Sequence, residues 1–108
     1  MAPTINDALI ERVVEHIVEA CAPEMVIVFG SAARGETQPG SDLDLLVVLD
    51  LPKDMTTRQM SRKLHVLFEG WLLPLDIIVL SRQEWTHGMR LLGHIARTAE
   101  REGVRVYG

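Results

Sequence analysis

Residues 25–49 read MVIVFGSAARGETQPGSDLDLLVVL. Two apolar runs, 25–29 and 43–49, flank a polar loop, and their Val, Ile and Leu content is typical of strands buried on both faces. Asp42 and Asp44 lie two positions apart where the second run begins, so both side chains should point to the same face of the strand. Two carboxylates at the edge of a core repel each other and resist desolvation, so this pair favours a bound cation.

The composition is that of one globular domain spanning residues 1–108, with 47% hydrophobic and 24% charged residues. The net charge of −4 and the lack of a Lys or Arg cluster argue against direct nucleic-acid binding. Cys21 stands alone, which excludes an internal disulfide and fits a reducing compartment. Charges interrupt every apolar segment, so the sequence predicts no contact with a membrane and a soluble, cytoplasmic protein.

One helix is expected before the 25–49 segment in the sequence, and another after it. Thr4 is the expected cap of a first helix, which ends before Pro23. A second long helix is expected over 55–70, with a buried face formed by the following residues: Met60, Leu64, Leu67, Phe68 and Trp71.

The last third of the chain predicts one strand and two helices. The strand covers 75–80, and Ser81 is expected to cap a short helix through residue 85. A last helix is expected over 89–102, with these residues buried: Leu91, Leu92, Ile95, Ala96 and Ala99. Residues 104–107 are expected either to form an additional edge strand or to extend from the domain without regular secondary structure.

This order of elements predicts an α/β (α+β) fold, a small mixed β-sheet flanked by helices. The helix over 55–70 is long enough for a crossover, which would make the strands 43–49 and 75–80 parallel neighbours. Asp76 would then start its strand at the same sheet edge as Asp42 and Asp44. If the strand 25–29 runs antiparallel to the strand 43–49, it brings Gly30 and Ser31 to that edge as well.

Such a site suits nucleotidyl transfer, the displacement of pyrophosphate from the α-phosphate of a nucleoside triphosphate. Two Mg²⁺ ions about 3.5–4 Å apart can neutralise the charge that develops in this reaction. Mg²⁺ prefers hard oxygen ligands and completes its shell with water and phosphate. Asp42 and Asp44 suit a bridging pair, whereas Asp76 suits the ion nearer the attacking hydroxyl.

The glycine-serine turn suits the phosphates of the same nucleotide. Gly30 has no Cβ and permits a close approach of the β- and γ-phosphates. Ser31 can offer its backbone N–H and hydroxyl, and Arg34 can add charge-assisted hydrogen bonds.

Purely structural roles stay open for the charged residues. Turn N–H groups or Arg34 can satisfy Asp42 and Asp44, and Asp76 can be a strand-start residue near solvent. Arg34 can pair with Glu36 or Asp42 instead of a phosphate.

The pattern Gly-Ser-x-x-Arg-Gly, then Ser-Asp-x-Asp, then a lone Asp in a later apolar strand resembles the DNA polymerase beta-like nucleotidyltransferase superfamily. More narrowly, it resembles the minimal nucleotidyltransferases. The resemblance implies that Gly30 and Ser31 form the phosphate-contacting turn. It also implies that Asp42, Asp44 and Asp76 are metal ligands.

The same resemblance implies a biological setting. Many minimal nucleotidyltransferases are antitoxins encoded beside a HEPN-domain ribonuclease toxin, and some transfer AMP from ATP to a tyrosine of that toxin. Two alternatives stay open: transfer to a small hydroxylated molecule such as an antibiotic, and an antitoxin that acts by contact without catalysis. The sequence leaves open whether the protein forms homo- or hetero-oligomers.

Overall fold

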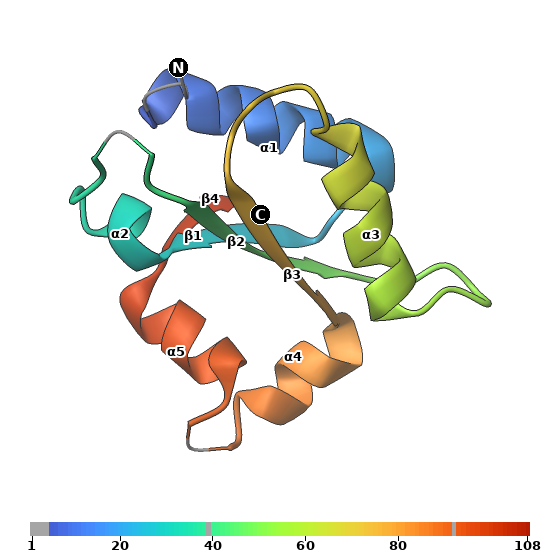
Figure 1. Ribbon diagram of the computed structural model, residues 1–108. Coiled ribbons are helices and arrows are strands. Elements are labelled where there is room, and N and C mark those ends of the chain that lie inside the picture. Colours follow the sequence, from blue (N-terminus) through green and yellow to red (C-terminus); the bar gives the residue numbers. More distant parts are fainter. Residues whose placement is uncertain (1–4, 39, 92) are drawn as a thin grey trace.

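The computed structural model describes residues 5–38, 40–91 and 93–108 and contains a four-stranded mixed sheet. The strands are β1 (Met25–Phe29), β2 (Leu43–Leu49), β3 (Leu75–Ser81) and β4 (Val104–Tyr107). They lie in the order β3-β2-β1-β4. β2 and β3 run parallel, and β1 is antiparallel to both β2 and β4 (Figure 1). The predicted fold class and the predicted direction of the first three strands are therefore confirmed.

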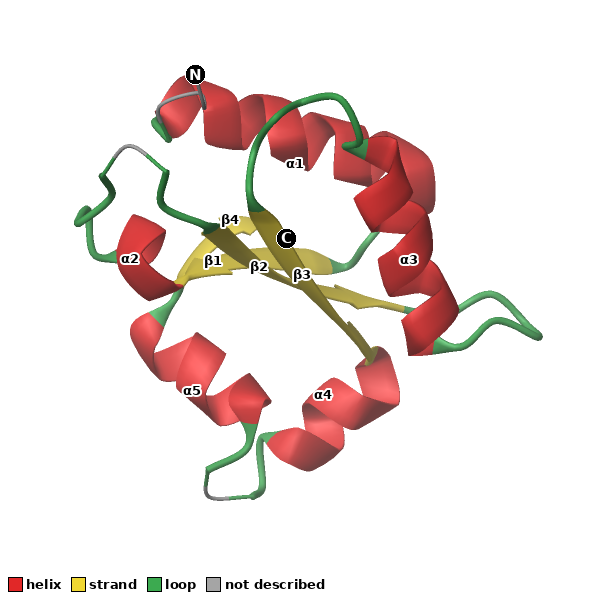
Figure 2. Ribbon diagram, viewed as in Figure 1, coloured by secondary structure: helices red, strands yellow, loops and turns green. Residues whose placement is uncertain are grey.

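Helices cover both faces of the sheet. α1 (Asp7–Cys21) and α3 (Thr57–Leu67) lie on one face, and α4 (Arg82–Gly88) and α5 (Ile95–Glu102) lie on the other (Figure 2). The single-turn helix α2 (Gly30–Ala33) connects the end of β1 to the loop before β2.

Alternate residues of β2 point into two different cores. Leu43, Leu45 and Val47 pack with α1 and α3, whereas Leu46 and Val48 pack with the side of α4 and α5. All five are fully buried, which explains why the run is continuously apolar rather than alternating. Any polar side chain on β2 can therefore only be accommodated at its ends.

The helix boundaries differ from the prediction at several places. Asn6 caps α1, since its side chain accepts a hydrogen bond from the N–H of Leu9, while the expected cap Thr4 lies outside the described residues. α3 starts at Thr57 behind a Thr56 capping box and ends at Leu67, which is shorter than the predicted 55–70. Met60, Leu64 and Phe68 are buried as expected, Trp71 is half-buried, and Leu67 is exposed.

The last helix is also shorter than the predicted 89–102. It begins at Ile95, because Gly93 has a positive φ of 79° and the side chain of His94 accepts a hydrogen bond from the N–H of Ala96. Leu91 lies before this start and is exposed, so its predicted burial was wrong, and Leu92 lies outside the described residues. Ala96 and Ala99 are buried as predicted. Ser81 caps α4, as expected, although α4 runs on to Gly88.

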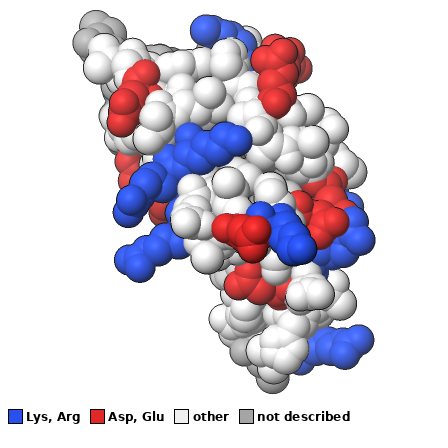
Figure 3. All heavy atoms as spheres, turned by 90° about the vertical axis from the view of Figure 1, so that its right-hand side faces the viewer, with Lys and Arg blue, Asp and Glu red and all other residues white. Residues whose placement is uncertain are grey.

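The surface shows mixed charge on the side of the molecule that Figure 3 presents. Lys and Arg side chains alternate there with Asp and Glu rather than gathering into one basic area. In the part of the chain that the structure describes, no helix is long and apolar enough to cross a membrane.

Candidate nucleotidyl-transfer site

Asp44 and Asp76 are direct neighbours across the parallel pair of strands β2 and β3. They lie opposite each other in the register, each one position inside the start of its strand. Two residues further along, Leu46 and Ile78 point to the core beneath α4 and α5, so the strand period places both carboxylates on that same face. The predicted meeting of Asp44 and Asp76 at one sheet edge is therefore observed.

The glycine-serine turn lies against the same place. Phe29, the last residue of β1, is opposite Asp44 in the antiparallel register, and Gly30 follows directly. Gly30 has a φ of 69°, and a Cβ at this position would overlap the Oδ2 atom of Asp44. The positive φ favours glycine here, and an added Cβ would force the Asp44 carboxylate to shift.

Ser31 occupies the first turn of α2 beside this carboxylate. Its carbonyl accepts hydrogen bonds from the N–H groups of Arg34 (3.2 Å) and Glu36 (2.9 Å), which closes the turn. Within the described residues, its hydroxyl makes no hydrogen bond, so it is available to a ligand.

Asp42 lies in the loop just before β2 and is exposed. Its carboxylate is close enough to act electrostatically on Asp44. The loop is held by Ser41, whose hydroxyl accepts a hydrogen bond from the N–H of Gln38 at 2.8 Å. Ser41 is therefore a turn residue that positions Asp42.

The electrostatics of the three carboxylates favour a cation. Burial raises the pKa of Asp44, and the neighbouring charges of Asp76 and Asp42 raise it further. No Lys, Arg or His of the described residues forms an ion pair with any of the three. The site thus concentrates negative charge without a compensating side chain.

Arg34 forms its ion pair outside this cluster. Its Nε atom is 3.1 Å from Oε2 of Glu36, and both side chains are mostly exposed. Of the two structural pairings considered from the sequence, the one with Glu36 is present and the one with Asp42 is not. Only Nε takes part in this pair, so the two terminal NH2 groups of Arg34 remain available to a phosphate.

The donor set suits Mg²⁺ but does not form a closed cage. Asp42, Asp44 and Asp76 supply only hard carboxylate oxygens, which are the ligands that this ion prefers. Over the described ranges, no three acidic, His or Cys side chains are close enough to hold a metal ion by themselves. This arrangement fits ions that complete their shell with the phosphates of a bound nucleotide.

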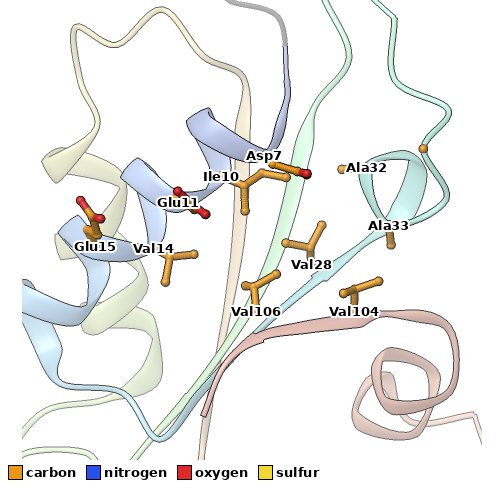
Figure 4. Close-up of a pocket in the computed structure, with 11 residues that line it drawn as sticks. Asp7, Ile10, Glu11, Val14, Glu15, Val28, Ala32, Ala33, Val104 and Val106 are labelled. Carbon is orange, nitrogen blue, oxygen red and sulfur yellow. The ribbon is translucent and has the colours of Figure 1, made fainter.

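A second surface was not anticipated from the sequence. Figure 4 shows a groove between α1, α2, β1 and β4. Because Val14 and Val28 of its lining belong to the core under α1 and α3, the groove lies on the opposite face of the sheet from Asp44 and Asp76. Its signal in the sequence is a row of acids spaced four apart, Asp7, Glu11 and Glu15.

Comparison with known proteins identifies the family of this chain. The model of the nucleotidyltransferase domain family matches residues 9–105. A protein of known structure described as a minimal nucleotidyltransferase is 29% identical, with a TM-score of 0.58, and the alignment covers 91% of this chain and 92% of that one. A nucleotidyltransferase structure from Sulfolobus solfataricus is 30% identical over 74% of this chain and 70% of its own, with a TM-score of 0.56.

A third solved structure is similar in fold alone. It is a toxin–antitoxin with AMP-PNP, 17% identical, with a TM-score of 0.54 over 91% of this chain and 73% of that one. No curated protein gives a significant match. Because the family model spans nearly the whole chain, the protein belongs to the nucleotidyltransferase domain family and is of the minimal type.

Proposed function

We propose that this nucleotidyltransferase transfers AMP from ATP to a hydroxyl of a partner protein, in a reaction that depends on divalent metal. The observation that carries the proposal is the register pair Asp44–Asp76, which lies beside the Gly30 turn and has no cationic side chain paired with it among the described residues. Such a place suits a triphosphate brought in together with metal ions.

Each residue has a role that follows from its position. Asp42, Asp44 and Asp76 would hold two Mg²⁺ ions, which when bound neutralise the phosphates and lower the pKa of the attacking hydroxyl. Gly30 lets the β- and γ-phosphates approach the backbone, and the hydroxyl of Ser31 donates a hydrogen bond to them.

The reaction itself exchanges one phosphorus–oxygen bond for another. The acceptor oxygen bonds to the α-phosphorus of ATP, while the bond from that phosphorus to the bridging oxygen breaks and pyrophosphate leaves. The acceptor proton passes to the exposed carboxylate of Asp76, which can release it to solvent.

For the acceptor, we propose a tyrosine of a HEPN-domain toxin, which makes the protein an antitoxin. Two arguments support this choice: the motif resemblance to minimal nucleotidyltransferases and the likeness in fold to a toxin–antitoxin structure with AMP-PNP. AMP-PNP is an adenine nucleotide, which is the reason to test ATP first.

The direct test combines the protein, Mg²⁺, ATP labelled at the α-phosphate and the product of the neighbouring gene. We expect label to move to that product, EDTA to abolish the transfer, and the Asp42→Ala/Asp44→Ala variant to lose it. Peptide mass spectrometry then locates the modified residue. Transfer by this variant at the wild-type rate would refute the assignment of the site.

Neutralisation of the toxin in cells separates catalysis from contact. We expect a triple variant, Asp42→Ala/Asp44→Ala/Asp76→Ala, to lose neutralisation while still folding. Full neutralisation by this variant would show that the antitoxin acts by contact alone. Labelled small molecules in a screen without partner protein would reveal the antibiotic-type acceptor instead.

A further inference from the structure

A groove with an apolar floor lies beside α1, on the face of the sheet opposite Asp44 and Asp76. Its volume is about 580 Å³, and Figure 4 shows side chains from α1 and from the sheet bordering it. The apolar lining consists mainly of Ile10, Val14, Val28, Ala33, Val104 and Val106.

The groove exists because α1 covers β1 but not β4. Val104 and Val106 of β4 line the groove and remain 49% and 37% exposed. On the other face of β4, Arg105 pairs with Glu100 of α5 at 3.2 Å. The helical layer formed by α1 and α3 therefore leaves this face of the edge strand β4 partly uncovered.

Among the described residues, the charged side chains that line the groove are all acidic. Asp7, Glu11 and Glu15 recur every four residues along α1 and all line the groove. Like charges at this spacing destabilise a helix by a few tenths of a kcal/mol per pair. None of the three forms an ion pair with any residue that the structure describes. An apolar floor with an acidic wall complements a ligand that has an apolar stripe flanked by cations.

We propose that this groove docks an amphipathic helix of the partner protein, with apolar residues on Val104 and Val106 and Lys or Arg side chains toward Glu11 and Glu15. A helix fits because the groove lies beside α1, in the helical layer that packs on this face of the sheet. A second copy of this chain would bring the same acidic wall and its net charge of −4 against the first.

This inference deepens the proposed function, on which it rests for the identity of the partner as the acceptor protein. α2 joins the two surfaces, because Ala32 and Ala33 line the groove while Gly30 lies against Asp44. A helix held in the groove would therefore tether the acceptor one helical turn from the phosphate-binding turn, without covering the carboxylates.

The probe for the test is a fluorescent peptide of about 18 residues, long enough to form a helix, with a Leu stripe flanked by Lys. Binding is followed by fluorescence anisotropy at low salt. We expect Glu11→Lys/Glu15→Lys to weaken binding at least about tenfold, and Val104→Thr/Val106→Thr to weaken it as well. A peptide with Glu in place of Lys should not bind.

Two controls make the outcome specific. Glu19→Lys also replaces a negative charge of α1 with a positive one, but Glu19 does not line the groove. This variant should therefore bind the peptide nearly as well as the wild type does. Asp44→Asn should also bind normally, which separates docking from nucleotidyl transfer. The inference is overturned if wild type does not bind the peptide, if Glu19→Lys weakens binding as much as the groove variants, or if the groove proves to be covered by self-association that those variants abolish.

Discussion

Gly30 lies so close to Asp44 that any side chain at position 30 would collide with the carboxylate. The two residues come from different elements and meet only because β1 and β2 pair in an antiparallel register that puts Phe29 opposite Asp44. This contact ties the phosphate-binding turn to the proposed metal ligand. A change at either residue should therefore affect both functions.

We predict that Gly30→Ala abolishes nucleotidyl transfer. The new Cβ would displace the Asp44 carboxylate, and the positive φ would also lower the free energy of unfolding by about 1–2 kcal/mol. Transfer assays and denaturant unfolding measure the two effects. Gly35→Ala is the matched control, because its φ of 68° is nearly the same and no described atom lies within 4 Å of the added Cβ. Equal losses of activity in the two variants would contradict the contact argument.

Asp44→Asn should inactivate the enzyme and stabilise it at neutral pH. Since the pKa of Asp44 is raised in the folded protein by burial and by Asp76 and Asp42, ionisation of this carboxyl destabilises the fold. The destabilisation is complete above the raised pKa and disappears as the pH falls through it to the ordinary carboxyl value of about 4.

Thermal unfolding with no added metal tests this prediction. The Tm of Asp44→Asn should exceed that of wild type by a few degrees at about pH 7, and the difference should vanish near pH 3. Asp50→Asn, an exposed carboxyl just after the other end of β2, should show no such gain. A lower Tm for Asp44→Asn at neutral pH would show that the carboxylate is stabilising instead.

Arg34 should matter for nucleotide binding and not for folding. Removing one charge-assisted hydrogen bond to phosphate is expected to raise the KM for ATP about tenfold in Arg34→Ala. The exposed ion pair with Glu36 contributes little to stability, so the free energy of unfolding should change by less than about 1 kcal/mol. In Glu36→Gln, which frees Arg34, the KM should stay the same or fall. An unchanged KM in Arg34→Ala would show that Arg34 does not bind the phosphates and that its role is the ion pair with Glu36.

Asn6→Ala should lower the free energy of unfolding by about 1 kcal/mol, because the Asn6 side chain caps α1 through the N–H of Leu9 at 2.9 Å. Chemical denaturation measures the loss. Asn6→Ser keeps a capping oxygen and should retain most of the stability. If both variants match wild type, another residue caps this helix.

Much of the fold could be predicted from local sequence. The apolar runs at 25–29 and 43–49 became β1 and β2 with the same bounds, since a strand buried on both faces needs continuous Val, Ile and Leu. The early end of α3 and the late start of α5 could not be predicted from apolar periodicity. Backbone features decided them, notably the positive φ of Gly93 before α5.

For the candidate site, the sequence alone determined that Asp42 and Asp44 have the spacing of one strand face and that a glycine-serine turn precedes them. Only the tertiary structure decided that Asp76 lies opposite Asp44 and that the Asp44 carboxylate fills the space where a side chain at position 30 would lie. The open groove beside β4 likewise depends on which strand α1 covers. The physical reason is that side-chain alternation is a property of a single strand, whereas register and coverage arise from the pairing and packing of segments far apart in the chain.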